Sequence, residues 1–234
     1  MKAVLLAAGL GTRLKPLTDA TPKCLVQVAG QTLLDIWLDT LAAVGVDEVL
    51  VNTHHLSGQV EAHVALRDDV PPSVRTAHEP ELLGSAGTLR ANRGLFEDDE
   101  MFLAVNADNL TDFDLRKLVD AQRTGGVVAT ITVFRTSRPT QCGIVEVTDG
   151  LVTGFEEKPL APRSNLANAG MYAFHPDVLA LTEGPPPCDI GYHLLPQLVG
   201  RARAVDLGDD YLRDIGTLEA LERAQVEWRG SVTR

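Results

Sequence analysis

The sequence predicts an α/β fold, a three-layer sandwich in which helices cover a mixed, mostly parallel central sheet. Short apolar runs alternate with helical segments along the chain, as in sheets whose parallel strands are joined by helices. The 234 residues are 44% hydrophobic and 23% charged, which is enough for one substantial core. A small-residue turn follows the first predicted strand directly. We therefore expect a single domain over residues 1–234.

Strands are predicted where short apolar and β-branched runs lie between turn residues. The first run is Lys2–Leu6, and it leads straight into a turn of alanines and glycines. The later runs are Val49–Val51, Val74–Ala77, Met101–Val105, Val127–Phe134, Ile144–Val147, Leu151–Phe155 and Ala169–Phe174.

Helices are predicted between these strands. Apolar residues recur at helical spacing from Leu33 to Val44, and Gly45 ends that helix. Further helices are expected near Leu56–Leu66, Ala86–Arg93, Leu115–Arg123, Asp177–Leu181 and Gly191–Val199, with a last one from Thr217. The three prolines of Thr182–Pro187 predict a loop. No hexapeptide repeat occurs, so no C-terminal β-helix is expected.

Charge and cysteine usage exclude several classes of protein. The net charge of −11 opposes non-specific binding to nucleic acid or to an anionic membrane. No run of 18 apolar residues and no signal-peptide pattern occurs, so a cytoplasmic protein is expected. Cys24, Cys142 and Cys188 are odd in number and widely spaced, which argues against disulfides and a zinc site.

The turn after the first strand is typical of a polyphosphate site. Short side chains let backbone N–H groups approach phosphate oxygens, and nearby cations add charge. The small residues are Ala7, Ala8, Gly9 and Gly11, and the cations are Arg13, Lys15 and Lys23. Neither familiar glycine loop fits. A dinucleotide fingerprint needs glycine where Leu14 stands, and a Walker loop needs Gly-Lys-Ser/Thr where Gly11 is followed by Thr12.

This segment resembles the signature of the sugar-1-phosphate nucleotidyltransferases, also called nucleoside-diphosphate-sugar pyrophosphorylases. The signature reads Gly-x-Gly-Thr-Arg-Leu, Pro-Leu-Thr and Pro-Lys-x-Leu-Val, and it stands at 9–14, 16–18 and 22–26. The resemblance implies the Rossmann-like fold of that family. It also implies that Arg13 clamps the phosphates of a nucleoside triphosphate and that Lys23 reaches the reacting phosphates. The other residues of this segment expected around the triphosphate are Leu6, Ala7, Ala8, Gly9, Gly11 and Thr12.

Two aspartates are candidate Mg²⁺ ligands. Asp108 follows a buried strand, where an aspartate alone is more often a turn or cap residue. The family resemblance implies instead that Asp108 holds Mg²⁺. Asn106, two residues earlier, is a candidate contact of the sugar phosphate. Tyr211-Leu-Arg-Asp214-Ile-Gly-Thr217 resembles a family block whose aspartate is the second ligand. Without that resemblance, Asp214 would simply precede a helix capped by Thr217.

Three further blocks resemble the sugar-binding part of the family. They are Cys142-Gly143, Glu156-Glu157-Lys158 and Asn168-Ala-Gly170. By resemblance, Glu157 accepts sugar hydroxyls, Lys158 contacts the sugar phosphate, Asn168 bonds a hydroxyl and Gly143 leaves room for the ring. Cys142 departs from the tyrosine common at its position, and alone the charged block would be an exposed turn.

The base is expected near Glu79–Gly87, which resembles a string typical of guanylyltransferases, lengthened by one residue. Guanine offers two neighbouring donors to a carboxylate, whereas uracil and thymine offer one. Glu79 is the candidate reader, with Gly84, Ser85 and Gly87 beside the nucleotide. Glu79 and Glu81 as surface acids, and Ser85 and Gly87 as the opening of a helix, remain open alternatives.

The sequence therefore predicts an enzyme in which a sugar 1-phosphate oxygen attacks the α-phosphorus of a nucleoside triphosphate, by Mg²⁺-assisted in-line displacement. Arg13, Lys23 and Asp108 are its candidate catalytic residues. GTP with mannose or manno-heptose 1-phosphate is the preferred pair. Uridylyl or thymidylyl transfer to N-acetylmuramate or glucose 1-phosphate stays open. A sugar-nucleotide-sensing subunit and a dinucleotide-dependent oxidoreductase are the other classes, and the chain is expected to be a monomer or homodimer.

Overall fold

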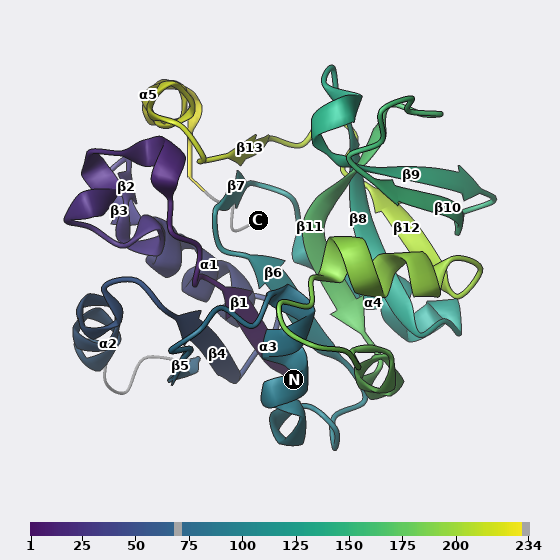
Figure 1. The fold of residues 1–234 in the computed structure, drawn as a ribbon, viewed down its shortest axis with the longest axis horizontal. Coiled ribbons are helices and arrows are strands. Elements are labelled where there is room, and N and C mark those ends of the chain that lie inside the picture. The colour runs from purple at the N-terminus through teal and green to yellow at the C-terminus, as the bar shows by residue number, and fades with distance from the viewer. Residues whose placement is uncertain (68–71, 231–234) are drawn as a thin grey trace. The chain divides into compact units, whose positions relative to one another are not determined.

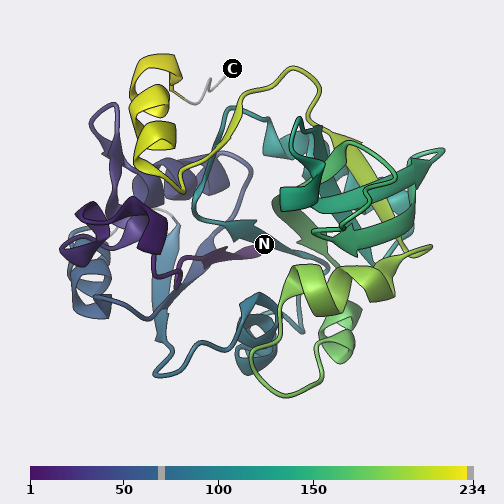
Figure 2. The same ribbon diagram turned by 45° about the horizontal axis from the view of Figure 1, so that its top comes forward.

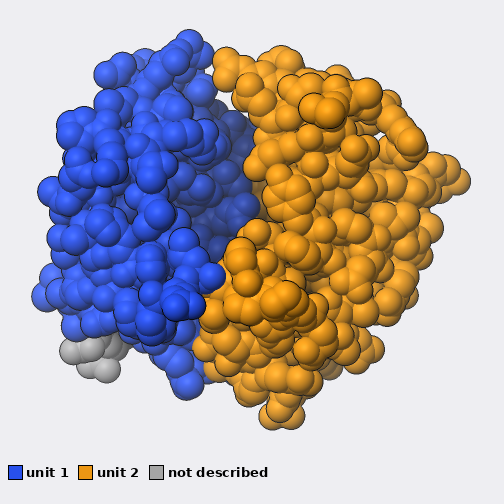
Figure 3. Space-filling model, viewed as in Figure 1, with its two compact units in different colours: residues 1–82, 105–113, 210–234 blue, residues 83–104, 114–209 orange. Residues whose placement is uncertain are grey.

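The computed structural model describes residues 1–67 and 72–230, and these fall into two compact units (Figure 3). Unit 1 comprises residues 1–82, 105–113 and 210–234, and unit 2 comprises residues 83–104 and 114–209. Each unit is therefore built from separate stretches of the chain, and each is described by itself. That the residues form one domain over 1–234 stays a prediction.

Unit 1 is built on parallel strands. β1 (Lys2–Leu6) pairs with β4 (Glu48–Thr53), and β4 pairs with β5 (Ser73–His78), all in parallel. The helices α1 (Leu33–Ala42) and α2 (Ser57–Ala65) join these strands, because parallel strands need a crossover connection, which is usually an α-helix. The interiors of β1 and β4 are fully buried, which explains their continuous apolar runs.

Two short antiparallel ladders complete unit 1. β2 (Gln27–Val28) pairs with β3 (Gln31–Thr32), and β7 (Asn109–Thr111) pairs with β13 (Leu212–Asp214). The last helix, α5 (Leu218–Glu227), begins at its predicted cap Thr217 and lies beside the β2–β3 hairpin (Figures 1 and 2). Gln225 holds it there, because its side chain bonds the backbone of Gln27 and Ala29.

Unit 2 is mainly antiparallel. β8 (Ala129–Arg135) pairs with β11 (Leu166–Phe174), and β9 (Gly143–Thr148) pairs with both β10 (Leu151–Glu157) and β11, all antiparallel. β12 (Ala202–Asp206) runs parallel to β8 and antiparallel to β10. β6 (Phe102–Asn106) carries the chain from unit 2 into unit 1. An α/β fold with strands of both orientations is thus confirmed, with parallel order in unit 1.

The helices of unit 2 differ in part from the predictions. α3 (Ser85–Ala91) and α4 (Leu115–Gly125) form as predicted. The predicted helix at Asp177–Leu181 is a 3-10 helix, Pro176–Leu181. The one predicted at Gly191–Val199 is a π-helical turn, Ile190–Leu194, followed by a 3-10 turn, Leu195–Leu198. Pro196 in that second turn has no N–H to donate, so a continuous α-helix is disfavoured.

The sequence prediction also missed five strands: β2, β3, β7, β12 and β13. Four of them are only two or three residues long. Such short segments carry too little periodicity to be recognised. β12 has five residues, but Arg203 and Asp206 break up its apolar run.

Candidate active site

The predicted phosphate loop begins where β1 ends. The N–H groups of Ala7 and Ala8 both donate to Oδ1 of Asn52, at 2.6 and 3.2 Å. Asn52 lies near the end of β4 and is 4% exposed. In this conformation the two N–H groups are therefore paired within the protein, and their approach to phosphate stays a prediction. Leu6, Ala7 and Ala8 stay predictions as residues that line the nucleotide site.

Gly9 and Gly11 of the loop differ in whether the protein itself requires a glycine there. Gly11 has a φ of +61°, and a Cβ on it would lie 2.8 Å from Cγ2 of Thr18. Thr18 is buried, and its hydroxyl donates to the Gly11 carbonyl at 2.8 Å, which closes the loop. By contrast, apart from its two neighbours in the chain, no atom of the residues that the structure describes would lie within 4 Å of a Cβ on Gly9. The protein itself therefore does not require glycine at position 9, so the open space is consistent with a ligand that comes close to the backbone.

The loop also presents unpaired donors. Across residues 1–67 and 72–230, no group accepts a hydrogen bond from the N–H groups of residues 9 to 13. A short 3-10 turn, Thr12–Leu14, follows Gly11 and bends this stretch. Successive unpaired N–H groups in a bent backbone form a site for anions.

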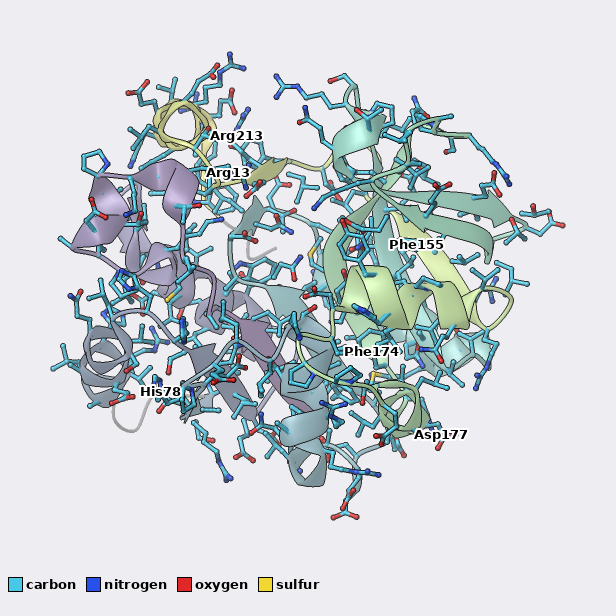
Figure 4. All side chains as sticks on the ribbon, in the orientation of Figure 1. Arg13, His78, Phe155, Phe174, Asp177 and Arg213 are labelled. Atoms are coloured by element: carbon cyan, nitrogen blue, oxygen red, sulfur yellow. The ribbon has the colours of Figure 1, made fainter. Side chains whose placement is uncertain are left out.

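Charged side chains from three parts of unit 1 meet at Lys23. Its ammonium lies 2.6 Å from Oδ2 of Asp108 and 3.6 Å from Oδ1 of Asp214. Arg13 Nη2 lies 3.5 Å from Oδ2 of Asp214, and Figure 4 shows Arg13 beside the segment that carries Arg213. The Arg13 side chain is 66% exposed, whereas that of Lys23 is 10% exposed. Lys23 is thus fixed between the two carboxylates, and Arg13 stays accessible.

The β7–β13 ladder brings Asp214 to Asp108. Asp214 pairs with Asn109, and the N–H of Ile215 donates to the Asp108 carbonyl at 2.9 Å. The indole of Trp37 donates to the Asn109 carbonyl at 2.7 Å and holds the ladder against α1. The two aspartates are more than a hundred positions apart in sequence, so their proximity depends on this short ladder.

A glycine lets Arg13 approach the second aspartate. A Cβ on Gly216 would lie 2.7 Å from Nη2 of Arg13 and 2.8 Å from Oδ2 of Asp214. Any larger residue at 216 would therefore push Arg13 away from Asp214. The predicted block 211–217 thus contributes this space as well as the carboxylate.

A small hollow joins the loop to Lys23 and Asp108. Its other lining residues are Leu6, Ala7, Gly9, Cys24 and Ala107. The N–H of Ala107 donates to the Leu6 carbonyl at 3.2 Å, which holds the ends of β1 and β6 together. Asn106 lies half-buried at the end of β6. Thus the phosphate loop and the first predicted metal ligand open onto one space in unit 1.

The donor set of this space fits Mg²⁺. Partial burial and the neighbouring charge of Asp108 raise the pKa of Asp214, whereas Lys23 and Arg13 oppose that shift. Two carboxylates whose charges repel in this way favour a cation between them. Within the described ranges, no cluster of three or more His, Cys, Asp or Glu side chains could hold a metal. Mg²⁺ needs only one or two carboxylates, because substrate phosphates and water complete its shell.

The predicted base-reading block is divided between the units. Glu79, in unit 1, is 4% exposed and accepts a hydrogen bond from Asn52 at 3.0 Å. It is therefore a buried group and not a surface acid, whereas Glu81 is exposed. That Glu79 reads the base stays a prediction.

The start of α3, with Gly84, Ser85 and Gly87, lies in unit 2 and packs against the backbone of Cys188. A Cβ on Gly84 would lie 2.5 Å from the Cys188 carbonyl oxygen, which also accepts from the N–H groups of Ala86 and Gly87. The Ser85 hydroxyl accepts from the N–H of Ile190 at 2.7 Å, and Gly84 takes the cap position of α3. Ser85 is therefore not the helix cap.

Three predicted sugar-binding residues lie together at the open ends of β9 and β10 in unit 2. Glu157 pairs with Gly143 in the ladder, and its side chain is 16% exposed. A Cβ on Gly143 would lie 2.5 Å from Oε2 of Glu157, and one on Gly191 would lie 2.7 Å from the same atom. Gly143 thus makes room for a carboxylate of the protein itself. Burial raises the pKa of Glu157, and Lys158 opposes the shift.

Lys158 and Asn168 differ in how firmly they are held. Lys158 is 53% exposed, with Nζ 3.7 Å from Oε1 of Glu157 and 5.8 Å from the centre of the Tyr192 ring. The amide of Asn168 donates to the Tyr172 hydroxyl at 2.7 Å and accepts from the N–H of Gly170 at 3.1 Å. Asn168 therefore supports a bulge in β11, while Lys158 is accessible to a ligand.

Sequence reasoning missed Asn52, Thr18 and Gly191 as residues that shape these sites. The available signal for Asn52 was a polar residue at the end of a buried strand, where ligand-facing side chains often lie. Thr18 stood inside the recognised motif without an assigned role. Nothing local distinguished Gly191 from a turn glycine.

The family model for nucleotidyl transferases matches residues 2–229, so this chain belongs to the nucleotidyl transferase family. Curated relatives include a "mannose-1-phosphate guanylyltransferase catalytic subunit beta" from Drosophila pseudoobscura, 35% identical over 79% of this chain. Another of that name, from Dictyostelium discoideum, is 29% identical over 97% of this chain. A mannose-1-phosphate guanyltransferase from Candida albicans is 32% identical over 92%. The aligned parts make up 51%, 67% and 61% of these relatives' own lengths.

A solved structure has the same fold. It is a Bacillus anthracis protein assigned as a glucose-1-phosphate thymidylyltransferase and crystallised with a sucrose. The TM-score is 0.85 at 21% identity, over 97% of this chain and 94% of that one. The nucleotidyltransferase type of α/β fold predicted from the sequence is therefore confirmed. In the ranges that the structure describes, no helix is both long enough and apolar enough to cross a membrane.

Proposed function

We propose that this chain transfers a nucleotidyl group from a nucleoside triphosphate to a sugar 1-phosphate and releases pyrophosphate. Two observations in unit 1 support it most: the N–H groups of residues 9–13 have no partner among the described residues, and Gly9, Lys23 and Asp108 line one hollow. Such a site suits a polyanion that reacts at phosphorus. GTP and mannose 1-phosphate are the proposed pair, because the curated relatives are named for those substrates.

The protein residues act by binding and orienting. The N–H groups from Gly9 to Arg13 hold the triphosphate, and the Arg13 guanidinium neutralises the leaving pyrophosphate through paired hydrogen bonds. Lys23 orients the phosphates at the reacting end. A sugar 1-phosphate is already an anion at neutral pH, so the displacement needs no protein nucleophile. Asp108 and Asp214 would hold Mg²⁺, which when bound neutralises charge on the reacting phosphates.

Unit 2 supplies the proposed sugar contacts. Glu157 accepts hydrogen bonds from sugar hydroxyls, and Lys158 pairs with the phosphate of the sugar 1-phosphate. Asn106 in unit 1 and Asn168 in unit 2 are further proposed contacts. Gly84, Ser85 and Gly87 are proposed to lie beside the nucleotide.

The test is a matrix of the nucleoside triphosphates against mannose, manno-heptose, glucose and N-acetylmuramate 1-phosphates with Mg²⁺. Pyrophosphate release and the nucleotide sugar are measured by coupled assay and mass spectrometry. We expect the highest kcat/KM for GTP with mannose 1-phosphate. Release only with UTP or dTTP would overturn the guanylyl assignment. Nucleotide binding without release for any pair would indicate a sensing subunit.

A pair of lysine variants provides the matched comparison. Lys23→Met removes the ammonium at the centre of the site, whereas Lys15→Met removes one that is 59% exposed and pairs with Asp19. We expect Lys23→Met to abolish pyrophosphate release and Lys15→Met to leave most of it. Equal activity of the two variants would contradict the role of Lys23.

A further inference from the structure

Asn52 connects the phosphate loop to the segment that follows β5. Its Oδ1 accepts from the N–H groups of Ala7 and Ala8, and its Nδ2 donates to Oε1 of Glu79 at 3.0 Å. Both Asn52 and Glu79 are 4% exposed. Three neighbouring parallel strands of unit 1 thus meet through one buried amide.

The carboxylate of Glu79 fixes which way this amide faces. A side-chain amide has a donor end and an acceptor end, whereas an ionised carboxylate only accepts. Glu79 therefore selects the orientation in which Nδ2 faces it and Oδ1 faces the loop. The backbone of Glu79 is held in turn, because its N–H donates to the Thr53 carbonyl at 2.8 Å and its carbonyl lies 2.7 Å from Nδ1 of His54.

The two backbone N–H groups that Asn52 holds come directly before those that have no partner among the described residues. Ala7 and Ala8 are tied down, and the N–H groups from Gly9 to Arg13 have no partner among the described residues. A buried and polar contact that fails costs more than the bond itself is worth. The hydrogen bonds of Asn52 and Glu79 can therefore fix the backbone of the loop at the point where it leaves β1.

We propose that Asn52 and Glu79 are positioning residues, a buried brace that holds the first turn of the phosphate loop. The inference rests on the proposed function, and it reassigns Glu79 from reading the base to orienting Asn52. Preorganised N–H groups bind phosphate better than mobile ones, because the ordering is complete before the ligand arrives.

The test reverses the direction of the buried hydrogen bond. Asn52→Asp keeps an acceptor for Ala7 and Ala8 but sets a second carboxylate against Glu79. Adding Glu79→Gln gives position 79 a donor for the new carboxylate at position 52, so the double variant restores the contact with opposite polarity. Binding of inorganic tripolyphosphate and of GTP is measured by calorimetry, with kcat and KM for the transfer reaction and circular dichroism for folding.

We expect Asn52→Asp to weaken tripolyphosphate and GTP by the same factor, about 10-fold or more, as for a lost charged or buried hydrogen bond. The double variant should return both affinities to within about threefold of wild type, since the contact is restored. A merely structural role would lower the melting temperature of Asn52→Asp without changing the affinity of the folded protein for tripolyphosphate or GTP.

Other outcomes overturn the proposal. If Glu79→Gln alone lowers GTP affinity and leaves tripolyphosphate unchanged, Glu79 reads the base. If Asn52→Asp changes neither affinity, the brace does not position the loop. The proposed function fails separately: wild-type protein would then release no pyrophosphate with any substrate pair, and tripolyphosphate binding by the three variants would still report on the brace.

Discussion

Lys23 is held by carboxylates that the proposed reaction also needs. Its ammonium lies 2.6 Å from Asp108 and 3.6 Å from Asp214, and the side chain is largely buried. In the free protein this contact compensates two negative charges that repel each other. A bound polyphosphate and a divalent cation would change that balance, because they bring both signs of charge into the same space. We therefore expect substrate binding to exchange ion pairs: Lys23 would pair with phosphate, and the two aspartates would pair with the divalent cation.

Asp108→Asn removes one charge from this exchange while keeping the shape of the side chain. We predict a fall in kcat on the order of 100-fold or more, because one preorganised electrostatic group is lost. Initial rates of pyrophosphate release at saturating substrates measure it. Asp19→Asn is the control, since that carboxylate is half-exposed and forms its ion pair with Lys15, away from the hollow. A kcat for Asp108→Asn within about threefold of wild type would contradict the assignment.

At the scale of elements, α1 is held by charges at its start. Thr32 caps the helix, because its hydroxyl oxygen accepts from the N–H of Asp35 at 3.0 Å, and the same hydroxyl donates to Oδ2 of Asp35 at 2.6 Å. His63 and Arg67, at the end of α2 and just beyond it, lie 3.0 and 2.8 Å from the same carboxylate. Asp35 therefore joins α1 to α2 and to the turn that follows it.

This cluster predicts a pH-dependent stability. Partial burial opposes ionisation, but hydrogen bonds from Thr32, His63 and Arg67 hold the pKa of Asp35 below its usual value. A lowered pKa in the folded state stabilises the protein above the unfolded-state pKa of about 3.9, and the gain is lost as pH falls through the folded pKa. We expect Asp35→Asn to lower the free energy of unfolding by about 1 to 3 kcal/mol at pH 7.

Urea unfolding of wild type and Asp35→Asn at pH 7 and at pH 3 measures this effect. The difference between the two proteins should shrink in acid, because the wild-type carboxylate is then becoming protonated. Asp39→Asn is the matched control on α1, since Asp39 is 54% exposed and meets Arg67 only at the surface. Its cost should stay below about 1 kcal/mol. A pH-independent difference for Asp35→Asn would refute the role of its charge.

For the whole molecule, features formed by consecutive residues were predictable from the sequence, whereas contacts between distant segments were not. The phosphate loop and the strand ahead of it could be read directly, because their residues are consecutive. Asp108 and Asp214 were paired only through the resemblance to a family, since the β7–β13 ladder that unites them is three residues long. The position of Asn52 at the end of a buried strand was the available signal, but its role could not be predicted, because its three partners come from segments that only folding brings together.

The composition of the chain poses a further question at this scale, because a protein of net charge −11 is proposed to bind a polyanion. The answer lies in short-range contacts, since at 0.1 M ionic strength charges more than about 10 Å away are largely screened. Binding should therefore stabilise the folded state despite the net charge. At about 100 times its Kd, GTP with Mg²⁺ should add about 2.7 kcal/mol and raise Tm by roughly 5 to 10 °C.

Thermal unfolding followed by fluorescence, with GTP, ATP, UTP and dTTP each at the same concentration, measures this shift. We expect the largest shift for GTP, a smaller one for tripolyphosphate, and a reduced one when EDTA removes the metal. Lys15→Met should keep the shift, and Lys23→Met should lose most of it, because Lys23 lines the hollow and Lys15 does not. Equal shifts for all four nucleotides would contradict a guanine preference, and the absence of any shift would contradict nucleotide binding itself.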